Sequence, residues 1–260
     1  MKPSLRFESI QLRVRDLARS VDFYTRGVGF VARSRTAERA ELATERATPP
    51  SLVLVADPAA ARAPDDTAGL FHAALLLPTR AALGRWLRHA ANEGVSFDGF
   101  SDHGVSEAIY LTDPDGNGLE FYADRPREAW PFVEGELAMG TLPLAVPDLL
   151  AAATPADEPL LAGAHWGHLH LRVSDLDRSE AFYSAALGLK RTQRFGNQAR
   201  FLAADDYHHH IGLNTWGGIR RPQPPGALGF SEATFARVGS AESRTVRDPD
   251  GLTLQIHDAR

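Results

Sequence analysis

The feature of this sequence that most restricts its fold is an internal repeat. The segment VRDLARSVDFY, from Val14 to Tyr24, returns as VSDLDRSEAFY from Val173 to Tyr183. A second string, Asp-Pro-Asp-Gly, occurs at 113–116 and again at 248–251. Recurrence of this kind indicates duplicated supersecondary units. We therefore expect the chain to fold from several copies of one small module.

Each full module is predicted to run as a strand, a helix and then three strands. The segment from Phe7 to Val14 alternates as a half-buried strand does, Asp16 can cap the helix that follows, and Gly27 or Gly29 can end it. Further strands are expected at 29–34, 40–43 and 51–56. The pattern then restarts with a strand at 70–77, a helix at 79–93, and strands that include 105–112 and 119–122.

The modules define the predicted domains. Residues 1–126 hold two modules, at about 5–58 and 69–124. Residues 164–260 hold a third module, at about 165–217, and a shortened fourth, at about 228–257, which lacks the helix. The proline-containing stretch 127–163 is expected to be a linker with a short helix near 147–153. The fold class is α+β.

Composition excludes several classes of function. The 260 residues include no cysteine, which excludes disulfides, thiolate catalysis and cysteine zinc sites. The net charge is −5 and no basic run is long enough to follow a phosphate backbone, so nucleic acid is not an expected partner. No apolar run approaches the length of a membrane span, and the N-terminus lacks the apolar core of a signal peptide. We expect a cytoplasmic protein with no membrane partner.

Three groups of residues could carry chemistry. Glu120 stands between Leu119 and Phe121 after a turn at 113–118. It either faces solvent on an edge strand or is buried, where it needs a cation or hydrogen bonds to stay charged. His72 and His168 lie in apolar strands, where a hydrogen-bonded core histidine and a metal ligand are both compatible with the pattern.

The third group is the triple histidine at 208–210. Tyr207 and the apolar residues 211–213 around it favour a strand over a surface turn. By contrast, His170 is expected to face the opposite side of its strand from His168.

Several strings resemble the vicinal oxygen chelate superfamily, which includes glyoxalase I, bleomycin- and fosfomycin-resistance proteins and type I extradiol dioxygenases. The strings that carry this resemblance are HLHLRVSDLDRSEAFYSAALGL at 168–189 and YLTDPDGNGLEFY at 110–122. Those that resemble its catechol 2,3-dioxygenase-like branch are GLFHAALLLP, SDHGVSEAIYLTDPDGNGLEFYADRP and YHHHIGLNTW. The resemblance implies βαβββ modules that pair into curved, mixed β-sheets around one metal ion.

The resemblance also implies a ligand set of two histidines and one carboxylate, namely His72, His168 and Glu120. Such a triad holds Fe(II), with Mn(II) as a possible substitute, and leaves positions open for a catechol and O₂. The usual arrangement pairs module one with two and three with four. Here the corresponding strands of modules one and four offer only Ser9, Gln11, Phe230 and Gln255. Our hypothesis is therefore that module two pairs with module three around the metal, and module one with module four.

Three further residues match catalytic positions of that branch. His209 corresponds to its acid–base histidine, which takes a proton from the catechol, and His103 and Tyr110 correspond to residues that contact the substrate oxygen. The expected function is extradiol cleavage of a catechol-type aromatic diol by O₂.

Two alternatives stay open. One is a glyoxalase-like, metal-dependent lyase or isomerase, which needs a second carboxylate base where this chain offers His209. The other is a non-enzymatic protein that binds small molecules, as the antibiotic-resistance members do. The specific substrate and any homo-oligomer are left open by the sequence.

Overall fold

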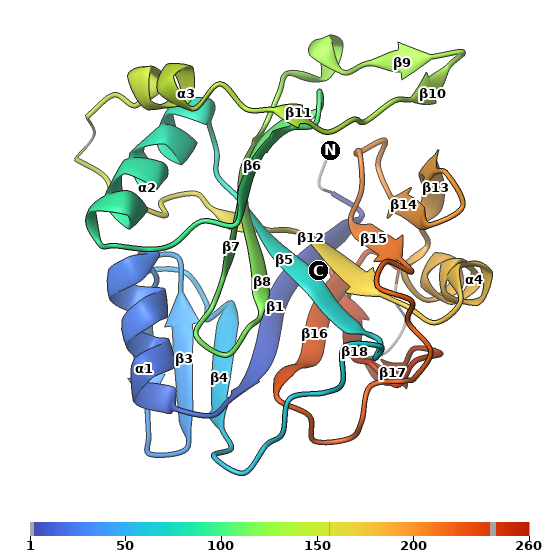
Figure 1. Cartoon of the computed structure of the whole chain (residues 1–260), viewed down its shortest axis with the longest axis horizontal. Helices are drawn as coiled ribbons and strands as arrows, with labels where there is room; N and C mark the ends of the chain where they lie inside the picture. Colours follow the sequence, from blue (N-terminus) through green and yellow to red (C-terminus); the bar gives the residue numbers. More distant parts are fainter. Residues whose placement is uncertain (1–2, 156, 240–242, 260) are drawn as a thin grey trace.

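Two large β-sheets dominate the computed structural model, which describes residues 3–155, 157–239 and 243–259. Figure 1 shows the sheets curling past one another, with a few helices at their outer sides. The first sheet has seven strands, in the spatial order β17 (Arg244–Arg247), β18 (Thr253–Asp258), β16 (Gly229–Arg237), β1 (Leu5–Val14), β4 (Leu52–Ala56), β3 (Arg39–Ala43) and β2 (Val31–Arg35).

The second sheet has nine strands and carries all the candidate ligands. Its spatial order is β11 (Leu142–Pro143), β6 (Gly99–Asp102), β7 (Ser106–Thr112), β8 (Gly118–Asp124), β5 (Gly69–Leu76), β12 (His165–Arg172), β15 (Ile211–Asn214), β14 (Ala199–Ala203) and β13 (Lys190–Phe195). Both sheets mix parallel and antiparallel pairs, which agrees with the expected α+β class.

The pairing of the modules is the one inferred from the ligand distribution. In the nine-stranded sheet, β5 of the second module pairs antiparallel with β12 of the third. In the seven-stranded sheet, β1 of the first module pairs antiparallel with β16 of the fourth. The hypothesis that module two joins three, and module one joins four, is confirmed by this sheet order.

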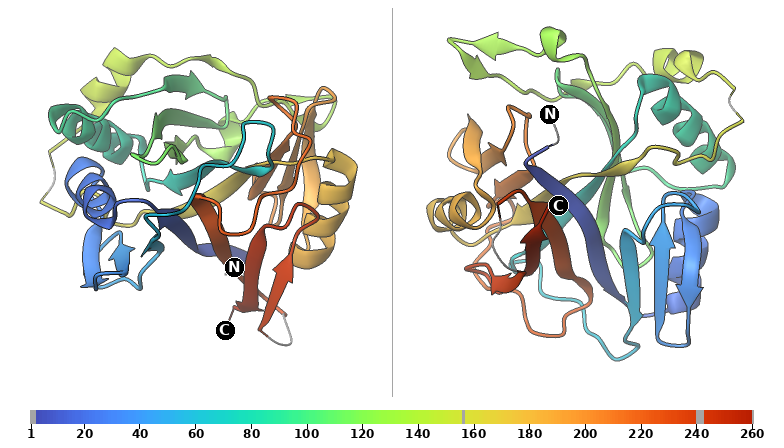
Figure 2. Two further views of the ribbon diagram at one scale, coloured as in Figure 1. Left: turned by 60° about the horizontal axis from the view of Figure 1, so that its bottom comes forward. Right: turned by 180° about the vertical axis from the view of Figure 1, so that it is seen from behind.

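The first helix begins at the capping residue that the sequence indicates, and two further helices also begin at capping side chains. Asp16 accepts a hydrogen bond from the backbone N–H of Arg19 and caps α1 (Leu17–Asp22), which continues as a π-helical turn, Phe23–Gly27. Thr79 caps α2 (Arg80–Asn92), and Asp175 caps α4 (Leu176–Leu187). Figure 2 shows α1 and α2 together on one side of the molecule and α4 on the other. None of the helices in the described ranges is both long and apolar enough to cross a bilayer.

The repeated strings contact each other across modules. The hydroxyl of Tyr24, at the end of the first repeated helix motif, donates to Asp113 of the turn in module two at 2.9 Å. The equivalent Tyr183 donates to Asp248 of module four at 3.0 Å. All four residues are buried, and burial raises the pKa of both carboxyls, against the hydrogen bonds that they accept. The recurrence of the two strings therefore reflects two equivalent tertiary contacts.

The expected linker is partly structured. It contains a 3₁₀ turn (Arg127–Ala129), a hairpin of β9 (Phe132–Val133) and β10 (Glu136–Leu137), and the helix α3 (Val146–Ala152) near the position predicted for it. Strand β11 of this stretch pairs with β6 and extends the nine-stranded sheet. Part of the segment between the halves therefore borders the site.

Alternation along the strands separates a core face from a site face. In β8, Leu119, Phe121 and Ala123 join the main hydrophobic core, while Glu120 and Tyr122 face the other way. The core face is anchored by Trp86 of α2, whose ring stacks on Phe121 with centroids 3.8 Å apart. Burying aromatic side chains of this size contributes roughly 1.5–3 kcal/mol each. This packing holds the opposite face of the sheet in register.

Candidate metal centre and its pocket

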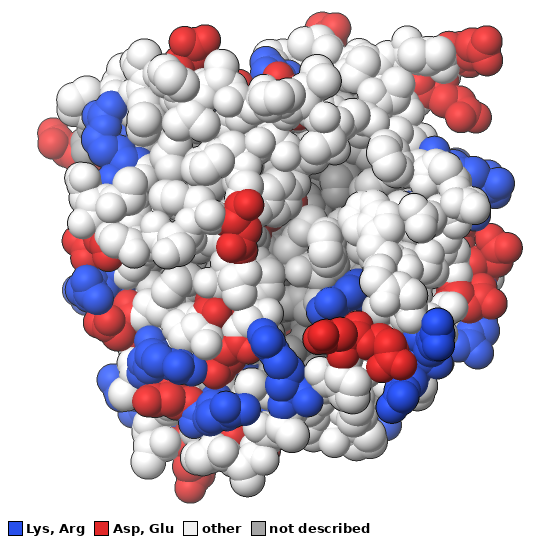
Figure 3. Space-filling model, in the orientation of Figure 1, with Lys and Arg blue, Asp and Glu red and all other residues white. Residues whose placement is uncertain are grey.

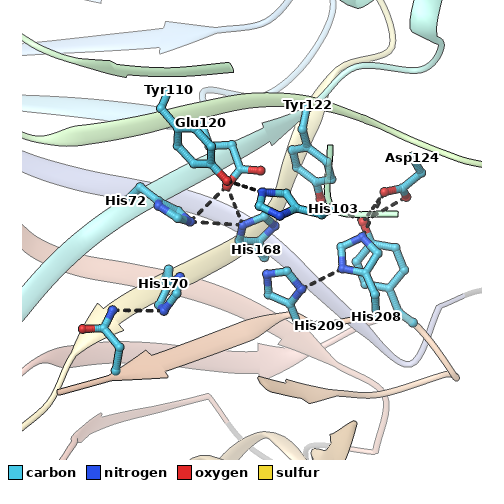
Figure 4. Close-up of polar contacts among 12 residues, drawn as sticks. His72, His103, Tyr110, Glu120, Tyr122, Asp124, His168, His170, His208 and His209 are labelled. Carbon is cyan, nitrogen blue, oxygen red and sulfur yellow. Dashed lines mark hydrogen bonds and ion pairs between the residues drawn. The ribbon is translucent and has the colours of Figure 1, made fainter. Parts of the chain in front are cut away.

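Three strands of the nine-stranded sheet deliver the candidate ligands to one point. His72 lies on β5, Glu120 on β8 and His168 on β12, which are neighbours in the sheet. All three point from the site face, as Figure 4 shows. Each is nearly inaccessible to solvent. The solvent-exposed reading of Glu120 is therefore wrong.

The donor atoms of these residues converge. Oε2 of Glu120 lies 3.0 Å from Nε2 of His72 and 3.1 Å from Nε2 of His168, and the two Nε2 atoms are 3.4 Å apart. Adjacent ligands of an ion with bonds of about 2.0–2.2 Å lie roughly 3 Å from one another, which is the spacing found here. Two imidazoles and one carboxylate are the donors that suit a divalent transition metal such as Fe(II). The three residues fit a metal by both spacing and chemistry.

Burial decides the charge of this cluster. Burial alone would raise the pKa of Glu120, but the histidine charges and the hydrogen bonds from His168 and His72 lower it well below its usual range. Burial also lowers the pKa of His168 to about 4, against the attraction of Glu120. For the His168 imidazole, burial outweighs the attraction of Glu120, so this ring is uncharged at neutral pH. At neutral pH the cluster combines an ionised carboxylate with an uncharged ring, which favours binding of a cation.

His103 and Tyr110 form a hydrogen-bonded pair beside the triad. Nδ1 of His103 lies 2.6 Å from the carbonyl of Gly140, so this nitrogen must carry the proton. Nε2 of His103 is then the acceptor for the hydroxyl of Tyr110, at 2.7 Å. Burial, followed by the negative charge of Glu120, raises the pKa of Tyr110 well above its usual value. Tyr110 is therefore a neutral hydrogen-bonding group next to the cluster.

His209 lies against the triad without joining it. Its ring packs on that of His168, with centroids 4.1 Å apart, and it lines the same pocket. The prediction that residues 208–210 lie in a strand was wrong, because β15 begins only at Ile211. The loop conformation lets the consecutive rings of His208 and His209 contact each other, which the alternation of a strand would not allow.

His170 was also misplaced by the sequence analysis. Residues two apart on a strand share a face, so His170 points to the same side as His168 and its ring centroid lies 4.9 Å from that of His72. Its Nε2 atom is 3.0 Å from Nδ2 of Asn214, which donates to it. Gly212 makes room for the ring, since a Cβ there would lie 2.7 Å from it. Burial lowers the pKa of His170 well below its usual value, so it is neutral at pH 7.

A cavity of about 460 Å³ opens above the triad. Figure 3 shows a hollow near the middle of the molecule that is bordered mostly by uncharged residues, while most charged groups in this view gather toward the lower edge. The side chains that line the pocket are mostly aromatic or apolar, and they include Phe71, Leu111, Met139, Phe195, Phe201 and Trp216. Of the described residues that line it, none is Lys or Arg, whereas Asp98 and Glu120 are acidic.

A second layer of residues was missed by the sequence analysis. His208 is fully buried, and its Nε2 atom lies 2.9 Å from Oδ1 of Asp124. The same carboxylate accepts from Tyr207, which contacts Tyr122. Asp124 follows Glu120 at a spacing of four on β8, and this alternation, which places both side chains on one face, is the signal that could have identified it.

Comparison with known proteins identifies the family of this sequence. The family model described as the glyoxalase/bleomycin resistance protein/dioxygenase superfamily matches residues 6–121 and 165–236. A catechol-2,3-dioxygenase of Bacillus subtilis (strain 168) is 42% identical over 219 residues, which are 83% of this chain and 76% of that protein.

Solved structures share the fold. A Bacillus subtilis protein provisionally described as a dioxygenase superposes with a TM-score of 0.64 at 14% identity, covering 100% of this chain and 87% of its own. Glyoxalase I from Zea mays superposes with a TM-score of 0.58 at 18% identity, covering 98% of this chain and 92% of its own. At these identities the likeness concerns the fold alone.

Proposed function

Because the chain belongs to the glyoxalase/bleomycin resistance protein/dioxygenase superfamily, and because a triad of two histidines and one glutamate lies in its pocket, we propose that it is an extradiol dioxygenase. Its substrate would be a catechol-type aromatic diol and its second substrate O₂. The observation that carries the proposal is the convergence of His72, His168 and Glu120 in a chain 42% identical to a catechol-2,3-dioxygenase.

The triad would hold Fe(II), or Mn(II) in its place. Such an ion supplies a site where the diol and O₂ come together and where electrons pass from one to the other. In the reaction one ring carbon–carbon bond beside the hydroxyl-bearing carbons breaks, and both atoms of O₂ enter the product. No further reductant is consumed.

The remaining polar residues of the pocket handle protons and position the substrate. His209 is buried and neutral, since burial and the neighbouring histidines lower its pKa well below the usual value. A neutral ring at this place can accept a proton from a catechol hydroxyl and return it later. His103 and Tyr110 would orient the substrate oxygen through their own hydrogen bond.

The pocket favours an uncharged substrate. Its volume of about 460 Å³ lies within the usual range for small-molecule sites, and aromatic side chains can cover the faces of a ring. An anionic substituent would have to lose its hydration among apolar groups and near Asp98, and none of the described lining residues is a Lys or Arg that could pair with it. We therefore propose neutral, apolar catechols as substrates, and not catechols that carry a carboxylate.

An oxygen-uptake assay tests this proposal. The full-length protein is purified anaerobically, loaded with Fe(II), and mixed with catechol or 4-methylcatechol in buffer that contains O₂. We expect one O₂ consumed per diol and a product heavier than the diol by the mass of O₂, with both effects absent in Glu120→Ala. Iron-loaded protein that binds catechol yet consumes no O₂ would contradict the proposal. Isomerisation of a thiol–aldehyde adduct would then favour the glyoxalase-like alternative.

A further inference from the structure

The proposed base, His209, is the last member of a hydrogen-bonded chain that starts at the half-buried carboxylate of Asp124 and continues through the buried His208. Oδ1 of Asp124 lies 2.9 Å from Nε2 of His208. Nδ1 of His208 lies 2.7 Å from Nδ1 of His209. Figure 4 shows these side chains one after another beside the triad. His209 also lines the pocket.

We propose that Asp124 and His208 are positioning residues that fix the tautomer and orientation of His209. An ionised carboxylate can only accept hydrogen bonds, so Nε2 of His208 must donate to it. A neutral His208 then has its lone pair on Nδ1, and this atom can only accept from Nδ1–H of His209. The proton of a neutral His209 is thereby held on Nδ1, and the lone pair is left on Nε2.

The surroundings of this hydrogen-bonded chain of side chains hold it in place. His208 is fully buried, its ring lies 3.9 Å from that of Tyr207 between centroids, and Trp130 packs at its edge. The hydroxyl of Tyr207 donates to Oδ2 of Asp124 at 3.0 Å. The hydroxyl of Tyr122 lies 2.8 Å from that of Tyr207 and donates to it. Asp124 therefore has donors on both oxygens, which limits its rotation and the rotation of the rings that depend on it.

Fixing the tautomer of His209 decides which of its ring nitrogens can accept a proton. A histidine can accept a proton only at the nitrogen that lacks one, and in neutral imidazole either nitrogen can be that atom. No group among the described residues pairs with Nε2 of His209, so nothing but the Asp124–His208 pair selects the tautomer. Loss of such partners from metal-ligating histidines typically costs about 10- to 100-fold in metal affinity or activity, and we expect a loss of activity of the same order here.

The inference rests on the proposed function for its catalytic meaning, but its test does not need turnover. Full-length protein labelled with ¹⁵N-histidine is studied by NMR at neutral pH, without added metal and again with Zn(II) as a diamagnetic ion. We expect His209 to carry its proton on Nδ1 in the parent protein, and to show the Nε2–H form to a substantial extent in Asp124→Ala. A parent protein in which His209 is protonated on Nε2, or an unchanged tautomer in Asp124→Ala, would overturn the inference.

Variants of His208 keep the test informative if Asp124→Ala folds poorly. In His208→Gln the amide still offers an acceptor toward His209 and a donor toward Asp124, whereas His208→Leu offers neither. We expect His208→Gln to retain the Nδ1–H tautomer and most of kcat, and His208→Leu to lose the tautomer and about 10- to 100-fold in kcat with little change in KM. Equal behaviour of the two variants would contradict the assignment.

His210→Asn is the matched control. His210 is adjacent in sequence, but its Nδ1 atom accepts from the backbone N–H of Ala204. Its ring is not part of the Asp124–His208–His209 hydrogen-bonded chain. The tautomer of His209 should not change in this variant. If the tautomer results are as expected but no diol is cleaved, the positioning role stands and the proposed dioxygenase function fails.

Discussion

Nε2 of His72 on β5 lies 3.4 Å from Nε2 of His168 on β12, although 96 residues separate them in the chain. The two strands come from different modules and pair antiparallel, so the contact exists only because module two joins module three. The equivalent pair of strands in the other sheet, β1 and β16, offers no imidazole at this place. One sheet of the duplicated fold therefore carries the site, and the other serves as a scaffold.

Glu120→Ala is expected to remove the metal. A triad has no spare ligand, and a buried site of two imidazoles without the carboxylate also loses the negative charge that favours a cation. Elemental analysis should find iron near one per chain in the parent and close to none in the variant, with unchanged circular dichroism. Gln255→Ala, at the matching place in module four, is the control and should keep its iron. Full iron occupancy in Glu120→Ala would rule out this ligand set.

His209→Ala should keep the metal and lose turnover. The ring packs on His168 but is not one of the three converging donors, so its removal should leave metal content near that of the parent. Loss of an acid–base group typically lowers kcat by about 10²–10⁴-fold. Iron analysis and O₂ uptake on the same preparation separate the two effects. Metal loss as complete as in Glu120→Ala would make His209 a ligand instead.

The features that could be predicted from the sequence are those set by local patterns. The helix caps at Asp16 and Asp175 follow from side chains that reach a nearby backbone N–H. The pairing of modules two and three followed from where the histidines and Glu120 occur. The caps depend on residue type and spacing alone, whereas the pairing also depended on the resemblance to the superfamily, which implies that paired modules share one metal.

The features of the site that could not be predicted from the sequence depend on side-chain direction and on contacts between distant segments. His170 was assigned to the wrong face although a spacing of two places it beside His168, and the loop that carries His208 and His209 was taken for a strand. The contact of His208 with Asp124 joins positions 84 apart in the sequence, and no local pattern encodes it. Such contacts become visible only when the curvature of the sheet is known.

Substrate charge should matter more than substrate size. We expect 4-methylcatechol to be cleaved with kcat/KM at least about 10- to 100-fold above that of 3,4-dihydroxybenzoate, which corresponds to roughly 1.4–2.8 kcal/mol for placing a carboxylate in this pocket. Asp98 stands at the pocket, 2.5 Å from the hydroxyl of Thr112, and Asp98→Asn should narrow the difference. Steady-state kinetics with both diols provides the measurement. Equal efficiency for the two would show that the pocket does not select against an anion.

The metal-free protein should lose stability in mild acid through the partly buried His210. Burial lowers the pKa of His210 from 6.5 to about 4, so the unfolded chain binds a proton at a higher pH than the folded one does. This contribution is present above pH 6.5 and is lost as the pH falls from there toward 4. Between pH 7 and 5 it amounts to about 1–2 kcal/mol of unfolding free energy.

His210→Asn isolates this effect, because the amide oxygen can still accept from Ala204 N–H but does not titrate. Urea unfolding at several pH values should show a shallower decline for His210→Asn than for the parent. His165→Asn, which changes an exposed histidine, should follow the parent. A parent-like slope in His210→Asn would mean that this ring is not held neutral in the folded state.

Gln255→Glu should not create a second iron site in the other sheet. Gln255 occupies the place in module four that Glu120 occupies in module two, and its amide donates to Glu232 at 3.0 Å while accepting from Thr245 at 2.7 Å. A glutamate there would face Glu232 directly, so the two carboxylates would repel and the pKa of one of them would rise. We therefore expect lower stability at pH 7, and this stability should recover as the pH is lowered and that carboxyl takes up a proton.

Strand β18 brings no free imidazole to the new carboxylate, because its histidine, His257, is engaged with Glu8 at 2.7 Å. Elemental analysis should find one iron per chain, as in the parent, with Gln255→Ala as the neutral control. Two irons per chain in Gln255→Glu would mean that modules one and four retain a latent metal site.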